Sequence, residues 1–281
     1  METLSIKANA KINLSLDIVG KRENGYHNLR TIMHELPLFD DISLTLDEGE
    51  GVTAHTNLKF ISSESNLAAK AAALFLSAAG KRRSVSLNLF KRIPVGAGLG
   101  GGSADAAAVL KALNSHFGFP LSEKQLLELG KSLGADVPFC ILGGCALCEE
   151  IGDVMTPLPT LPHCHIAVVK PKVSISTPEM FKFYDRMKIK LRPDTGGIIS
   201  ALHAGDLPAV SRRLYNVMEE AAKNFTKDIS ELRGTLLRGG ALGACMSGSG
   251  SAVYGIFDSP GAAEAAVKPF GRGVSVFLLE I

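Results

Sequence analysis

The glycine-rich segment between Pro94 and Ala104 is the stretch whose residue types most clearly indicate chemistry. Five glycines lie between Gly96 and Gly102, and an alanine-rich helical pattern follows up to Leu113. Glycine lets the backbone adopt a positive φ and approach a ligand closely. The unpaired N–H groups at a helix start lie at the positive end of its dipole. The segment therefore predicts a binding site for a phosphate group.

The residues around these glycines distinguish the segment from two other phosphate-binding patterns. A Walker loop ends in Gly-Lys-Ser or Gly-Lys-Thr, whereas Ser103 directly follows a glycine. The stretch from Gly96 to Gly101 satisfies G-x-G-x-x-G, but a dinucleotide site also needs an acidic residue about 20 positions later, at a strand end. Ser122 in that region instead has the character of a helix N-cap. A dinucleotide site and a purely structural turn are thus the weaker alternatives, the turn because many glycines carry an entropic cost.

The composition is that of an ordinary globular protein. A chain of 281 residues with 46% hydrophobic and 21% charged residues suits one large or two medium domains. Its net charge of +2 gives no reason to expect a nucleic acid or a membrane as partner, and it leaves the oligomeric state open. The first residues lack the pattern of a signal peptide, and no apolar stretch is long enough to span a bilayer. We therefore expect a cytoplasmic protein.

The five cysteines suggest a second kind of chemistry, which is metal binding. Cys145 and Cys148 form a C-x-x-C pattern, and Cys164 lies between His163 and His165, so a zinc site is one interpretation. However, the region reads as a strand, in which Cys145 and Cys148 would point to opposite faces. We expect reduced thiols that are buried as small hydrophobic residues.

The elements that must position the glycine segment begin as strands. Polar and apolar residues alternate from Leu4 to Leu14 with the period of two that is typical of a strand. Asn-Gly at residues 24–25 indicates a hairpin. The pattern further predicts strands at 42–46, 84–89 and 145–149, and helices at 66–79, 104–116 and 122–133.

A domain boundary is expected near residue 157. Three prolines between residues 156 and 162 disfavour both a helix and a central strand. The chain is therefore predicted to be an α+β protein with domains at residues 1–157 and 158–281. Beyond the boundary we expect strands at 165–169, 243–246, 252–257 and 274–279, and helices at 178–185, 196–203, 207–214, 229–238 and 261–267.

Several motifs in this order resemble the GHMP kinase superfamily of small-molecule kinases. They are Lys11-Ile12-Asn13 with Gly25-Tyr26-His27, the loop from Pro94 to Ala104, and the late turn Gly248-Ser249-Gly250. Together with Gly134-Ala135-Asp136-Val137-Pro138, these motifs narrow the resemblance to members whose substrate carries a cytidine diphosphate, and the likeness covers nearly the whole chain. It implies a two-domain fold, with an ATP-carrying N-terminal domain like domain 2 of ribosomal protein S5 and a ferredoxin-like C-terminal domain.

The resemblance also implies an activity, which is ATP-dependent phosphorylation of a tertiary hydroxyl at position 2 of the substrate. Asp136 would accept the hydroxyl proton, and Lys11 would lie beside it. Magnesium would arrive with the nucleotide, since it keeps waters and phosphate ligands, and its protein ligands stay unknown. The residues expected to bind ATP are Pro94, Val95, Gly96, Ala97, Gly98, Leu99, Gly100, Gly101, Gly102, Ser103 and Ala104.

The same resemblance assigns five residues to the substrate. Tyr26 and Phe181 would stack on the two faces of the cytosine, an interaction that does not by itself select the base. His27 would hydrogen-bond the edge of the base and supply that selection. Asn13 and Thr177 match further substrate contacts.

Each of these roles has an ordinary structural alternative. Asp136 is also suited to capping a helix, Lys11 to a solvated strand, Tyr26 and Phe181 to core packing, and His27 to a structural contact. Ser251 stands where many members of the superfamily have proline, which leaves the path of the late turn open. The alternative functions are a GHMP kinase for another alcohol, such as mevalonate or homoserine, an NAD-binding oxidoreductase, and a non-catalytic nucleotide-binding protein.

Overall fold

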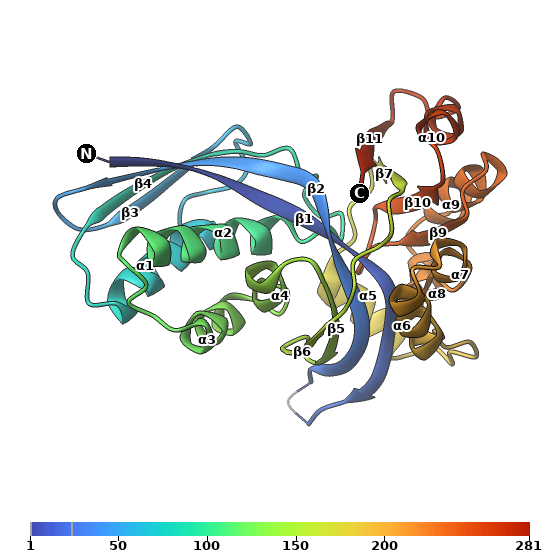
Figure 1. Cartoon of the computed structure of the whole chain (residues 1–281), viewed down its shortest axis with the longest axis horizontal. Coiled ribbons are helices and arrows are strands. Elements are labelled where there is room, and N and C mark those ends of the chain that lie inside the picture. The colour runs from blue at the N-terminus through green and yellow to red at the C-terminus, as the bar shows by residue number, and fades with distance from the viewer. Residues whose placement is uncertain (1, 24) are drawn as a thin grey trace. The chain divides into compact units, whose positions relative to one another are not determined.

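The computed structural model describes residues 2–23 and 25–281 and has the mixed helices and strands of an α+β protein (Figure 1). The chain forms two compact units, each built from separate stretches. The first unit consists of Met1–Ala10, Leu38–Ile93 and Gly100–Gly143, and the second of Lys11–Pro37, Pro94–Leu99 and Gly144–Ile281. The division into sequence domains at residue 157 stays a prediction.

The sheet of the first unit is built from β1 (Glu2–Lys21), β2 (His27–Asp47), β3 (Val52–Thr56) and β4 (Ser84–Phe90). Its strand order is β3-β4-β2-β1. β4 pairs antiparallel with β2 and parallel with β3. Val85, Leu87 and Leu89 of β4 are buried, as the period of two predicted. β2 is longer than the strand expected at 42–46, and both β1 and β2 continue into the second unit.

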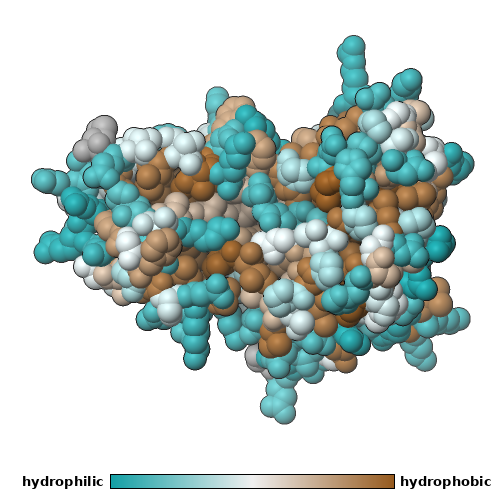
Figure 2. Space-filling model, viewed as in Figure 1, coloured by the Kyte–Doolittle hydropathy of each residue, from teal (hydrophilic) through white to brown (hydrophobic). Residues whose placement is uncertain are grey.

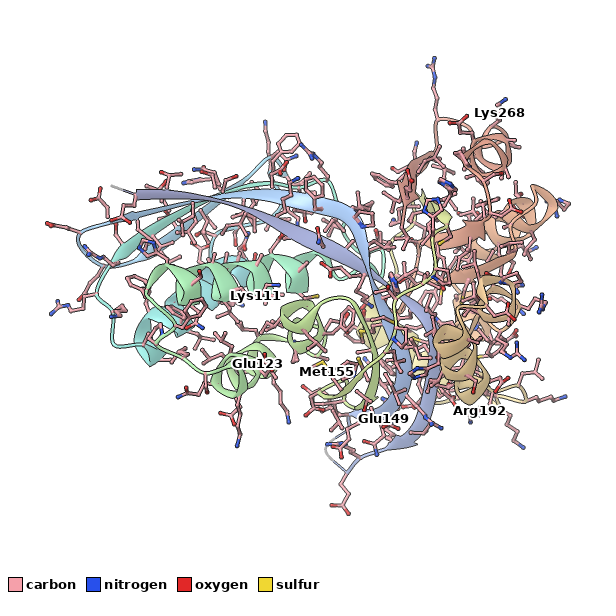
Figure 3. All side chains as sticks on the ribbon, viewed as in Figure 1. Lys111, Glu123, Glu149, Met155, Arg192 and Lys268 are labelled. Carbon is pink, nitrogen blue, oxygen red and sulfur yellow. The ribbon has the colours of Figure 1, made fainter. Side chains whose placement is uncertain are left out.

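The described part of the first unit contains the helices α1 (Leu67–Ala78), α2 (Gly101–His116), α3 (Glu123–Leu133) and α4 (Val137–Leu142). α1 and α2 lie together on one face of the sheet (Figure 1). Lys111 of α2 donates a hydrogen bond to the carbonyl of Ile141 in α4 at 3.4 Å (Figure 3). Ser122 forms a capping box with Gln125, so α3 begins at the predicted N-cap.

Two details of these helices differ from the sequence prediction. α2 begins at Gly101 rather than at Ala104, because Gly100 in the left-handed conformation serves as its N-cap. α4 was not predicted. It has six residues, which is too short for a helical period to be recognised.

In the second unit, the same sheet continues with β5 (Cys145–Glu150), β6 (Val154–Pro157) and β8 (Tyr215–Asn216). β5 pairs antiparallel with β2, β6 pairs with β5, and the short β8 runs parallel to β1. Neither β6 nor β8 was predicted. Pro157 ends β6, whose pairing among the described strands is with β5, and a proline is tolerated there because an edge strand needs fewer donors.

The second unit also contains an antiparallel sheet in the order β11-β7-β10-β9, which consists of β7 (His165–Pro171), β9 (Gly243–Met246), β10 (Val253–Phe257) and β11 (Val274–Glu280). Its core includes the buried side chains of Met180, Leu236, Val253 and Phe257. The helices of this unit are α5 (Thr177–Tyr184), α6 (Thr195–Ala204), α7 (Leu207–Arg212), α8 (Met218–Ala222), α9 (Asp228–Arg238) and α10 (Pro260–Val267).

The visible face of the molecule carries both hydrophobic and hydrophilic side chains (Figure 2). Brown and teal patches are interspersed over the visible face (Figure 2). Among residues 2–23 and 25–281, no helix has both the length and the apolar character that crossing a membrane requires.

Candidate active site

Lys11 belongs to a buried polar row on β1 in the second unit. Its Nζ donates to Asn13 Oδ1 at 2.9 Å, and Asn13 Nδ2 donates to Thr31 Oγ1 of β2 at 2.8 Å. Residues spaced by two in a strand share a face, which brings Lys11, Asn13 and Ser15 to the same side, and all three are buried. The Lys11 side chain is therefore not the solvated strand lysine of the structural alternative. A buried ammonium is costly unless it meets acceptors, and Asn13 Oδ1 is one such acceptor.

The first half of the glycine loop, Pro94–Leu99, is held against β1 and the end of β9. Lys11 N donates to the carbonyl of Leu99 at 3.0 Å, and Ala252 N donates to that of Ala97 at 3.0 Å. Ser247 Oγ donates to the carbonyl of Gly98 at 2.8 Å. Gly98 has φ 75°, and a Cβ added there would lie 2.0 Å from the Ser247 carbonyl oxygen. Only glycine fits this position.

The late glycine-serine turn, which contacts the loop through Ser247, is itself fixed by side-chain hydrogen bonds. Asn216 Nδ2 donates to the carbonyls of Met246 and Gly248 at 2.9 and 2.8 Å. The buried Ser251 donates through Oγ to the carbonyl of Val173, so the path left open by the sequence is now defined. Asn216 was missed by the sequence reading, since it lies outside every recognised motif and meets the turn only in three dimensions.

The second half of the loop, Gly100–Ala104, starts α2 in the first unit. Gly100 has φ 71°, and the first bond of the helix runs from Ala104 N to the Gly100 carbonyl at 2.8 Å. Because the N-cap is a glycine, it offers no side chain to the N–H groups of the first turn. A 16-residue helix whose N-cap residue makes no side-chain bond to it is suited to binding an anion.

The loop that carries Asp136 lies beside this helix start in the same unit. A Cβ added at Gly134 would be 3.9 Å from Ser103 Oγ, so the loop that carries Asp136 borders the first turn of α2. Asp136 is the N-cap residue of α4, but its side chain makes no capping bond to that helix. Asp136 therefore occupies the N-cap position of α4 without the side-chain bond that a capping carboxylate supplies.

A buried ion cluster supports the glycine loop from within the first unit, and sequence reading missed it. Lys91 Nζ contacts the carboxylates of Asp40 and Asp105. Asp40 Oδ1 also accepts from the backbone N–H of Ile93 at 2.8 Å, just before the loop begins. Burial raises the pKa of Asp105 to about 7, with Lys91 opposing the shift and Asp40 adding to it. A sequence signal for the cluster does exist, because each of its three charged residues stands within a mostly apolar stretch of the chain.

The residues expected to hold the base lie in the second unit, where His27 contacts both Phe181 and Asp185. The imidazole of His27 stacks on Phe181, with ring centroids 4.6 Å apart and planes inclined by 16°. His27 Nε2 lies 2.6 Å from Asp185 Oδ1. Tyr26 is 62% exposed, so it is not the core residue of the structural alternative. The prediction that Tyr26 and Phe181 enclose cytosine stays a prediction.

Thr177 and the cysteines complete the predicted set. Thr177 begins α5 and its Oγ1 lies 2.7 Å from Ser249 Oγ of the late turn.

All five cysteines are free thiols. Burial raises the pKa values of Cys145 and Cys164 to about 12, which disfavours the thiolate form that zinc requires. Within the described residues, no group of three His, Cys, Asp or Glu side chains is arranged to hold a metal ion.

Comparison with known proteins gives the family. The model for the GHMP kinases N terminal domain matches residues 66–144, and the one for the GHMP kinases C terminal matches residues 198–274. A 4-diphosphocytidyl-2-C-methyl-D-erythritol kinase of Alkaliphilus metalliredigens (strain QYMF) is 41% identical over 269 residues, which cover 95% of this chain and 92% of the relative. The kinase of the same name from Caldicellulosiruptor bescii is 43% identical over 255 residues, covering 90% and 89%.

Solved structures agree with this result. The crystal structure of a 4-(cytidine 5'-diphospho)-2C-methyl-D-erythritol kinase matches with a TM-score of 0.81 and 33% identity, covering 99% of this chain and 98% of that one. A homoserine kinase from Cytophaga hutchinsonii has a TM-score of 0.79 at 20% identity, which shows a shared fold. The chain therefore has the two-domain GHMP kinase fold and belongs to the family of 4-diphosphocytidyl-2-C-methyl-D-erythritol kinases within the ATP-dependent GHMP kinases.

Proposed function

We propose that the protein transfers the γ-phosphoryl group of ATP to the 2-hydroxyl of 4-diphosphocytidyl-2-C-methyl-D-erythritol, giving the 2-phosphate and ADP. This reaction is a step of the non-mevalonate route to isoprenoids. The observation that carries the proposal is the 41–43% identity, over nine tenths or more of the chain, to kinases that bear this substrate in their names. Two local features support it. They are the buried hydrogen bonds that link Lys11, Asn13 and Thr31, and the stacked rings of His27 and Phe181.

The glycine loop would bind the phosphates of ATP. Its residues Pro94–Ala104 combine backbone at positive φ with the N–H groups at the start of α2. Phosphoryl transfer depends mostly on positioning and on neutralising charge, and a backbone cradle supplies both without a flexible side chain. The bonds from Ser247 and Ala252 to the loop carbonyls would hold the cradle in place before the nucleotide arrives.

Asp136 and Lys11 would act on the acceptor hydroxyl. Asp136 would orient the hydroxyl and accept its proton, while Lys11 would balance the negative charge that develops as the phosphoryl group is transferred. Asn13 bonds Lys11 Nζ and would hold the ammonium in a single position. Proton removal by a positioned carboxylate typically contributes about 10²–10⁴-fold to the rate.

The cytidine end of the substrate would be held by residues of the second unit. Tyr26 and Phe181 would stack on the cytosine, His27 would bond its edge, and Thr177 would contact the substrate at the start of α5. Stacking would contribute affinity for any base, whereas hydrogen bonds to the edge of the base would select cytosine.

Magnesium would enter with ATP. Mg²⁺ commonly keeps waters and nucleotide phosphates as ligands, so the nucleotide can supply part of its coordination. When bound, the ion would neutralise phosphate charge. We assign no protein side chain to it. We propose that the protein acts in the cytoplasm, where ATP is abundant.

A direct assay tests this function. The purified chain is incubated with ATP, Mg²⁺ and the cytidine diphosphate substrate, and ADP release is measured together with the phosphorus NMR signal of a new phosphate monoester. Mevalonate and homoserine serve as competing acceptors. We expect turnover with the cytidine substrate, and turnover of mevalonate or homoserine without it would contradict the proposal.

A further inference from the structure

Asp185, which follows α5, is the feature of the second unit that the proposed roles do not use. Its carboxylate bridges two partners, since Oδ2 accepts from Lys21 Nζ at 2.5 Å and Oδ1 lies 2.6 Å from His27 Nε2. The two contacts differ in exposure. The Lys21 side chain is 54% exposed, whereas that of His27 is only 7% exposed. The contact with His27 is therefore the one that is shielded from water.

The protonation of this group follows from its partners. Hydrogen bonding to Lys21 holds the pKa of Asp185 below its ordinary range, and His27 adds to the shift. A charged carboxylate can only accept hydrogen bonds, so His27 Nε2 must be the donor. In a neutral imidazole the other nitrogen then carries the lone pair. Within residues 2–23 and 25–281, Nδ1 of His27 makes no hydrogen bond.

We propose that Asp185 determines base specificity by holding His27 in the tautomer whose Nδ1 accepts a hydrogen bond from the exocyclic amine of cytosine. Cytosine presents an N4 amine at this edge, whereas uracil presents the O4 carbonyl. A lone pair on Nδ1 attracts the amine and repels the carbonyl. The substrate class selected is thus a cytidine diphosphate ester over its uridine counterpart. Asp185 is a positioning residue that acts through His27, and the inference rests on the proposed function.

The stacking geometry leaves room for the base in this arrangement. For rings in contact at a spacing of about 3.5 Å, the centroid separation of 4.6 Å between His27 and Phe181 means a sideways displacement of roughly 3 Å. Part of the Phe181 face therefore extends beyond the imidazole. A base lying in the plane of the imidazole would stack on that part and turn its edge toward His27.

The first test reads the tautomer and needs no turnover. Nitrogen-15 NMR of the histidine rings distinguishes a protonated ring nitrogen from one with a lone pair, and the His27 signals are assigned by their loss in His27→Asn. In the substrate-free protein we expect Nε2 protonated and Nδ1 unprotonated. In Asp185→Ala we expect a mixture of both tautomers. The same single tautomer in Asp185→Ala would overturn the proposal.

The second test measures kcat/KM with the cytidine substrate and with its uridine analogue. We expect Asp185→Ala to lower the cytidine-to-uridine ratio by about 5- to 150-fold, which is the range for one correct base-edge contact. The KM for ATP should stay unchanged, and Asp185→Glu should restore part of the ratio. Glu150→Gln is the matched control, because it breaks the nearby Arg22–Glu150 ion pair and leaves His27 untouched. In a His27→Ala background, Asp185→Ala should change the ratio no further.

The outcomes separate this inference from the proposed function. Equal losses of kcat/KM for both substrates in Asp185→Ala would mean a purely structural role and would overturn the inference. Absence of turnover in the unmodified protein would contradict the proposed function, while the NMR measurement would still decide whether Asp185 sets the tautomer.

Discussion

Replacing Gly98 by alanine is the sharpest test of how the glycine loop is held. Gly98 has φ 75°, and an added Cβ would lie 2.0 Å from the carbonyl oxygen of Ser247 and 3.1 Å from the backbone nitrogen of Gly250. Both neighbours are backbone atoms, which cannot turn aside like the end of a side chain. Since ordinary Cβ contacts begin near 3.4 Å, the loop and the late turn must separate by more than an ångström.

The expected size of the effect follows from two contributions. An alanine in the left-handed conformation costs about 1–2 kcal/mol, and overpacking adds about 1–3 kcal/mol. Gly118→Ala is the matched control, because Gly118 has a similar φ of 74° and a Cβ there meets no atom within 4 Å. Gly98→Ala should therefore be less stable than Gly118→Ala by the overpacking contribution alone. A displacement near 1 Å also lowers turnover by about 10²-fold.

The measurements are urea unfolding of both variants and steady-state kinetics with ATP as the varied substrate. We expect Gly118→Ala to keep the kinetic constants of the unmodified protein, while Gly98→Ala has a raised KM for ATP and a lowered kcat. If folded Gly98→Ala matched Gly118→Ala in both stability and kinetics, the contact between the loop and the Ser247 turn would not constrain the loop as argued.

Three further predictions concern single side chains. The folded pKa of Asp105 near 7 lies above its ordinary value of 3.8, so the folded protein binds the proton more tightly. The free energy of unfolding should then fall by up to about 1.4 kcal/mol per pH unit as pH rises from about 4 to 7. Urea unfolding across this range should show a flatter profile for Asp105→Asn, and an unchanged slope would refute the assignment. Tyr26→Ala, at a 62% exposed position, should raise the KM for the cytidine substrate by about 5- to 150-fold and leave that for ATP unchanged; equal effects would exclude stacking. Asp136→Ala should lower kcat by about 10²–10⁴-fold without unfolding the protein by circular dichroism, and near-normal turnover would remove Asp136 from the mechanism.

Local sequence patterns predicted most of the elements because their causes are local. Ser122 caps α3 through a bond to a residue three positions away, and the alternation of β4 needs only its own residues to be seen. The missed elements, among them β6, β8, α4 and α8, have six residues or fewer, which is too few for a period to be recognised. β8 has two residues and exists because it pairs with β1, and α4 is a single short stretch after Asp136.

The candidate site shows the same division. The motifs around Lys11, His27 and Asp136 were recognisable from their neighbours in the chain. Their supports were not, since Asn216 reaches the late turn from 30 or more positions away. Asp40, Lys91 and Asp105 come from β2, the segment after β4, and α2. Each is an ordinary charged residue in its own segment.

The sequence by itself determined the glycine loop, the helix that follows it and the residue types available for phosphoryl transfer, because backbone freedom and side-chain chemistry are properties of the residues themselves. Only the tertiary structure decided that Gly98 touches the Ser247 carbonyl, that Lys11 is buried on a polar row, and that Asp185 meets His27. These contacts join segments that are far apart in the chain, and their energies arise from burial and hydrogen-bond geometry, which exist only once the chain has folded.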